Sequence, residues 1–119
     1  MHELAIASNI VDLVAEAAEG RRVRRVTLEI GKLSGVAPDA VAFCFPEVAR
    51  GTDAEDASLE IREIDGVARC EACGEEFATP TLLTICSCGS LSYQRIRGDE
   101  LNVKSIEVEE VDARTTASP

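Results

Sequence analysis

The first third of the chain carries two regular patterns of apolar and polar residues. Residues 3–19 place four apolar side chains at helical spacing, and Gly20 supplies a stop; the four are Ile6, Ile10, Val14 and Ala17. Residues 23–30 then alternate, with Val26, Leu28 and Ile30 on one face. A helix followed by a half-buried strand is therefore predicted.

A second helix and a second strand follow at similar spacing. Pro38 suits the first turn of a helix, whose apolar stripe comprises Val41, Cys44, Phe45 and Val48. Pro46 should kink or shorten this helix, because it lacks an amide proton. After the acidic linker 52–56, residues 58–64 read as a strand.

The last apolar stretch, residues 101–110, changes phase between Val103 and Ile106, which indicates a strand with a bulge. A lone strand is unstable, so it should return to the sheet formed by the first two. We therefore predict an α+β fold with a domain of two helices and three strands, and residues 66–99 as an inserted zinc-ribbon-like module. The first domain comprises residues 1–65 plus 100–111, and residues 112–119 form a disordered tail.

The composition narrows the classes of function. The 119 residues carry a formal charge of −10 and only 3% aromatic residues, so the core must be built of small aliphatic side chains. The negative charge disfavours nucleic acid and anionic membranes as partners. No stretch approaches the roughly 20 apolar residues of a membrane span, and the N-terminus lacks the features of a signal peptide. A cytoplasmic location is predicted.

Four of the five cysteines form two short turns, Cys70–Cys73 and Cys86–Cys88, separated by 12 residues. In a reducing compartment, such spacing is typical of a zinc ribbon. Four thiolates close the tetrahedron around Zn²⁺, so the predicted site is structural. Gly74 and Gly89 follow the pairs and allow tight turns. The fifth, Cys44, lies on the apolar stripe and is predicted to pack.

Two alternatives apply to the cysteine cluster. The thiols could be ordinary, but a segment so poor in large apolar groups needs a staple to fold. A redox dithiol would sit at a helix N-terminus, and nothing places these cysteines there. The single residue between Cys86 and Cys88 is fewer than the usual two, which affects the expected zinc geometry.

The sequence has one histidine, His2. A bulky second residue should preserve Met1, so the imidazole stands beside adjacent backbone nitrogens that can form chelate rings. Nitrogen and oxygen donors in a square plane suit Ni²⁺ or Cu²⁺. From chemistry alone, metal binding and an ordinary surface histidine are about equally supported.

Several segments together resemble the HypA/HybF family of hydrogenase nickel-incorporation proteins across nearly the whole chain. They are Met1–Leu4, Ile30–Val36, Ala42–Phe45, the two cysteine pairs, Gly98–Leu101 and Lys104–Val108. The resemblance implies a nickel metallochaperone that delivers Ni²⁺ during maturation of a [NiFe] hydrogenase. Its expected partners are a HypB-type GTPase and the hydrogenase large subunit.

The resemblance also assigns metal ligands. Nickel would be held by His2 and by backbone nitrogens that include Glu3, and Asp39 is a candidate for a further ligand. The zinc ligands carry over onto Cys70, Cys73, Cys86 and Cys88. The resemblance leaves open whether the protein is a monomer or a dimer, which hydrogenase it serves, and whether urease is also supplied.

Two other classes of function compete with this one. A zinc-ribbon interaction module without a nickel role is the main alternative. Residues 66–99 carry three arginines against four acidic residues, so a protein would be its partner rather than nucleic acid. An enzyme is not expected, because there is no second histidine, no nucleophile motif and no open zinc position.

Overall fold

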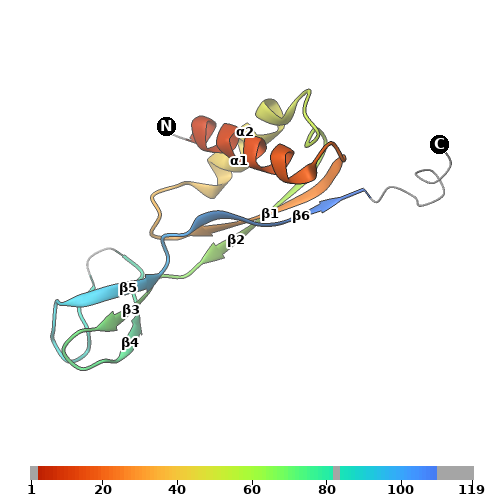
Figure 1. Ribbon diagram of the computed structural model, residues 1–119. Coiled ribbons are helices and arrows are strands. Elements are labelled where there is room, and N and C mark those ends of the chain that lie inside the picture. Colours follow the sequence, from red (N-terminus) through yellow and green to blue (C-terminus); the bar gives the residue numbers. More distant parts are fainter. Residues whose placement is uncertain (1–2, 82–83, 110–119) are drawn as a thin grey trace.

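The computed structural model describes residues 3–81 and 84–109. Its elements are α1 (Glu3–Ala18), β1 (Val23–Gly31), α2 (Pro38–Ala49), β2 (Ser58–Ile64), β3 (Val67–Cys70), β4 (Glu76–Ala78), β5 (Tyr93–Arg97) and β6 (Leu101–Val108). In this described part, two helices accompany two three-stranded sheets (Figure 1). The predicted α+β class is confirmed, and the predicted tail lies outside the described residues.

The first sheet has the order β2-β1-β6, with β2 parallel and β6 antiparallel to the central strand. The last strand therefore returns to the sheet of the first two, as predicted. The bulge is also confirmed. Thr27 pairs with Ser105 and Leu28 pairs with Val103, so Lys104 is the extra residue between them.

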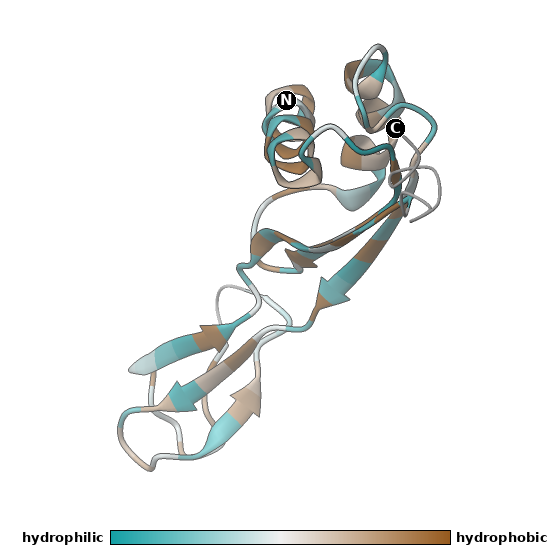
Figure 2. Ribbon diagram, turned by 45° about the vertical axis from the view of Figure 1, so that its right-hand side comes forward, coloured by the Kyte–Doolittle hydropathy of each residue, from teal (hydrophilic) through white to brown (hydrophobic). Residues whose placement is uncertain are grey.

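Both helices cover the same face of this sheet (Figure 1). Val26, Leu28 and Ile30 of β1 are completely buried beneath them, and α1 contributes Ile10, Val14 and Ala18 to the same core. Ala17, predicted to lie on the apolar face, is exposed. The inner face of α1 continues from Val14 to Ala18, four positions on. The strands alternate between hydrophobic and hydrophilic positions along their length (Figure 2).

The second helix runs through Pro46 and ends at Ala49, so the proline does not shorten it. Pro46 removes the amide that would bond the carbonyl of Ala42, but both residues lie on the exposed face. That carbonyl can therefore bond to water. Cys44 is half-buried on the same helix, in keeping with a packing role.

The second sheet has the order β4-β3-β5 and is formed by the chain between β2 and β6. It lies at the end of the molecule away from the helices (Figure 1). We call residues 66–99 the cysteine module. Neither helix is long and apolar enough to cross a membrane.

Candidate metal centre

The hairpin between β3 and β4 positions the first pair of cysteines. Cys70 is the last residue of β3, and the chain turns back immediately after it. The amide of Gly74 donates to the carbonyl of Cys70 at 2.9 Å, and Gly74 has φ of +79°. That conformation favours glycine, so the residue after Cys73 permits the turn that brings Cys73 beside Cys70.

The second pair lies in a turn before β5. The amide of Gly89 donates to the carbonyl of Cys86 at 2.8 Å, and Gly89 has φ of +93°. The amide of Cys86 in turn donates to the carbonyl of Ser90 at 3.2 Å. This compact turn presents Cys86 and Cys88 on one side, although only one residue separates them.

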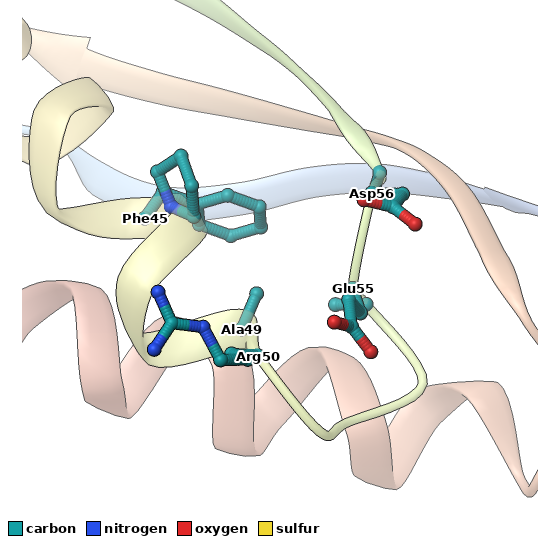
Figure 3. A pocket seen from close by; sticks show the side chains of 8 residues that line it. Phe45, Ala49, Arg50, Glu55 and Asp56 are labelled. Carbon is teal, nitrogen blue, oxygen red and sulfur yellow. The ribbon is translucent and has the colours of Figure 1, made fainter.

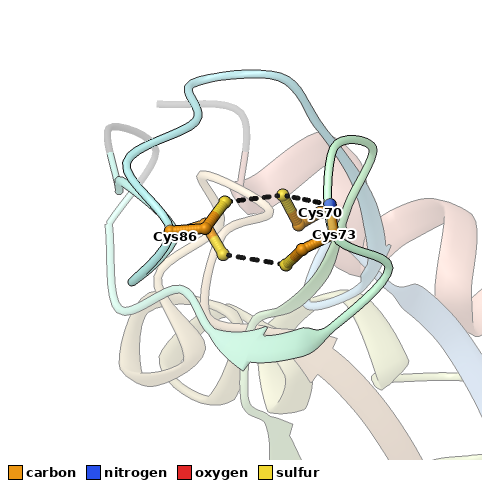
Figure 4. A group of neighbouring side chains, drawn as sticks. Cys70, Cys73 and Cys86 are labelled. Atoms are coloured by element: carbon orange, nitrogen blue, oxygen red, sulfur yellow. Dashed lines mark hydrogen bonds between the residues drawn. The ribbon is translucent and has the colours of Figure 1, made fainter.

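The two turns bring all four sulfurs together (Figure 4). Cys70 Sγ lies 3.6 Å from Cys88 Sγ, and Cys73 Sγ lies 3.7 Å from Cys86 Sγ. All four sulfurs lie within 4.8 Å of one another. A tetrahedral zinc with Zn–S bonds of about 2.3 Å requires S–S edges of about 3.8 Å. The short spacing of the second pair therefore does not prevent a tetrahedral arrangement.

The electrostatics of the cluster also favour a cation. The amides of Cys73 and Ala72 donate to Cys70 Sγ at 3.4 and 3.3 Å. The Cys73 amide is the main cause that lowers the pKa of Cys70 to about 6, against the opposing effect of burial. The glycines shape the turns, whereas the amides directed at this sulfur belong to Ala72 and Cys73.

The neighbouring Cys73 behaves in the opposite way. The Glu75 amide favours its thiolate, but the adjoining thiols, that of Cys86 foremost, and burial outweigh this and raise the pKa to about 12. Four sulfurs this close cannot all ionise without a compensating positive charge. A thiophilic divalent cation such as Zn²⁺ meets both requirements, geometric and electrostatic.

The predicted nickel site is described only in part. His2 lies outside the described residues, whereas Glu3 begins α1. The Oε2 atom of Glu3 accepts a hydrogen bond from the amide of Ala37 at 3.4 Å, directly before α2. Asp39 is exposed in the first turn of α2. The two helices therefore begin side by side, a contact that the sequence patterns did not reveal.

A separate hollow of about 280 Å³ lies between α2 and the loop before β2 (Figure 3). Phe45 and Ala49 line its apolar side, and Arg50, Glu55 and Asp56 line its polar side. Within residues 3–81 and 84–109, the cysteine cluster is the group of side chains that could hold a metal ion. The hollow does not share a residue with it.

Comparison with known proteins agrees with these features. Residues 1–108 match the family model described as "Hydrogenase/urease nickel incorporation, metallochaperone, hypA". The chain belongs to the HypA family. The "Hydrogenase maturation factor HypA" of Nostoc sp. is 55% identical over 111 residues, which cover 93% of this chain and 98% of that protein. The HypA of Geobacter metallireducens is 44% identical over 110 residues, covering 92% and 100%.

Two solved HypA structures share the fold. The solution structure of the Ni metallochaperone HypA from Helicobacter pylori superposes with a TM-score of 0.67 at 24% identity, covering 91% of this chain and 97% of that chain. A second solution structure of a HypA protein gives 0.68 at 23% identity, covering 92% and 97%. The resemblance predicted from the sequence is confirmed.

Proposed function

We propose that this protein binds Ni²⁺ at its N-terminus and delivers it during maturation of a [NiFe] hydrogenase. The observation that carries this proposal is membership of a family of nickel-incorporation metallochaperones, which extends over residues 1–108. Nickel is the cargo of the protein and is bound reversibly. His2 and the backbone nitrogens that include Glu3 are the proposed donors, with Asp39 as a candidate for a further ligand.

The contact between Glu3 and Ala37 supports this location. It ties the first residue of α1 to the residue preceding α2, so backbone atoms next to His2 are held against the body of the protein. The proposed site, with an imidazole and backbone nitrogens as donors, would be open, unlike the four-cysteine cluster. An open site with an imidazole donor can release its ion to a partner, unlike a closed thiolate site.

Zinc is the proposed occupant of the cysteine cluster, with Cys70, Cys73, Cys86 and Cys88 as its ligands. Four sulfur donors leave no position for substrate, so the metal would be structural. We propose that the cysteine module, residues 66–99, is an inserted domain folded around this ion. Residues 1–65 plus 100–111 would form the nickel-binding domain.

The proposed partners follow from the same role. A HypB-type GTPase and the hydrogenase large subunit would receive or exchange nickel with this protein in the cytoplasm. No catalytic activity is proposed, because a carrier needs only binding and release. Whether these partners bind is a separate question from nickel binding itself.

The decisive experiment measures bound nickel and zinc in untagged protein with its native N-terminus, beside His2→Ala. Asp12→Asn, at an exposed position of α1, is the matched control. We expect one zinc in all three proteins, and nickel in the native chain and the control only. Equal nickel binding by His2→Ala would overturn the proposal and leave a zinc-ribbon interaction module without a nickel role.

A further inference from the structure

The two sheets meet at three buried glycines whose backbones touch: Gly31 at the end of β1, Gly66 before β3 and Gly98 after β5. A Cβ on Gly31 would lie 2.0 Å from the carbonyl oxygen of Gly98, and a Cβ on Gly98 would lie 2.6 Å from Cα of Gly66. We call these residues the glycine junction. No other amino acid fits at these positions without displacing backbone atoms.

Backbone hydrogen bonds join one segment, residues 31–33, both to the first sheet and to the crossing between β5 and β6. The amide of Leu33 donates to the carbonyl of Gly98 at 2.7 Å, and the amide of Lys32 donates to that of Ile64 at 2.9 Å. The first of these reaches the crossing between β5 and β6, whereas the second stays within the first sheet, on the last residue of β2. Rotation of the cysteine module would therefore break the bond from Leu33 to Gly98, because residues 31–33 stay fixed to the first sheet.

Side chains of the same segment add further contacts. A Cβ on Gly66 would lie only 2.6 Å from the Cδ1 atom of Leu33. The leucine side chain therefore covers the junction. Lys32 Nζ lies 2.7 Å from Asp65 Oδ1, on the crossing between β2 and β3. Thr79, directly after β4, donates its amide to the carbonyl of Gly66 at 2.9 Å, a bond within the cysteine module.

We infer that the glycine junction is a rigid elbow that fixes the orientation of the cysteine module relative to the helices. Glycines between two sheets often act as a hinge, but here they permit close backbone packing instead. A partner that contacts both the module and the helices would meet one preformed surface. Binding would then have no entropic cost for fixing the two sheets relative to each other. This inference does not depend on nickel binding.

Residual dipolar couplings of backbone amides, measured on the full chain with Zn²⁺ supplied, test the elbow. One alignment tensor should fit the amides of both sheets. Gly31→Ala inserts a methyl group into the junction without requiring an unusual backbone angle, because Gly31 does not have positive φ. Two tensors are then expected, one for each sheet.

Gly35→Asn is the matched control, because it lies in the same loop, a Cβ there meets no atom within 4 Å, and asparagine tolerates the φ of +81° at this position. It should retain a single tensor. Should Gly31→Ala fail to fold, Leu33→Ala removes the cover of the junction and is expected to give two tensors. The elbow is overturned if the native chain needs two tensors, or if a folded, zinc-loaded junction variant still needs only one.

Discussion

The amide of Ala37 donates a hydrogen bond to the carboxylate of Glu3 at 3.4 Å, across 34 residues of sequence. This contact joins the start of α1 to the start of α2. The residue next to His2 is thereby held in place before any metal binds. Preorganisation of this kind strengthens binding, because less conformational freedom is lost when the ion arrives.

The first prediction is that Glu3→Ala weakens nickel binding by roughly threefold to tenfold, while zinc content stays unchanged. The backbone nitrogens remain, but their position is no longer fixed by the hydrogen bond. Titration calorimetry with Ni²⁺ measures the change. Glu16→Ala, at an exposed position of the same helix, should bind nickel like the native protein, and equal affinity in Glu3→Ala would contradict the role of the contact.

Nickel binding should also depend on pH. An imidazole with an unperturbed pKa of about 6.5 is neutral at pH 7.5 and mostly protonated at pH 5.5. Protons compete with Ni²⁺ for the same nitrogen, so the affinity should fall about tenfold between these two pH values. Equilibrium binding at both pH values measures this loss, and an unchanged affinity would exclude His2 as a ligand.

The parts of the fold that the sequence predicted are those with a long repeating pattern. Alternation along residues 23–30 and the change of phase after Val103 were enough to predict two strands and a bulge. Strands β3, β4 and β5 were not predicted, because each has only three to five residues. Their packing depends on the cysteine cluster and on the edge-to-face contact of Phe77 with Tyr93, with ring centroids 5.5 Å apart.

The candidate sites also differ in whether a local sequence pattern marks them. The cysteine cluster could be predicted because its ligands lie in two short turns with recognisable spacing. The contact of Glu3 with Ala37 and that of Gly31 with Gly98 join residues far apart in sequence. No local pattern marks such a contact, because it depends on how the helices and sheets are packed.

Loss of one zinc ligand should unfold the cysteine module selectively. In Cys73→Ser, the tetrahedron loses a sulfur, and amide signals of β3, β4 and β5 should collapse toward unfolded positions. The first sheet has its own apolar core, so signals of β1 should persist. Cys44→Ser, on α2, is the matched control and should keep both the zinc and the signals. A dispersed module spectrum in zinc-free Cys73→Ser would contradict the structural role of the metal.

The last prediction concerns Thr79, which is 1% exposed and whose Oγ1 atom has no hydrogen-bond partner among residues 3–81 and 84–109. A buried hydroxyl without a partner costs about 1–3 kcal/mol, so Thr79→Val should raise the free energy of unfolding by about 1 kcal/mol. Urea denaturation of the zinc-loaded protein measures the difference. Thr52→Val is the contrasting variant, because the Thr52 hydroxyl donates to the carbonyl of Ala49 at 2.7 Å and accepts from the amide of Ala54 at 3.0 Å. It should lower the stability by about 1 kcal/mol, and a Thr79→Val variant that is likewise less stable than the native protein would show that the hydroxyl of Thr79 is not a source of instability.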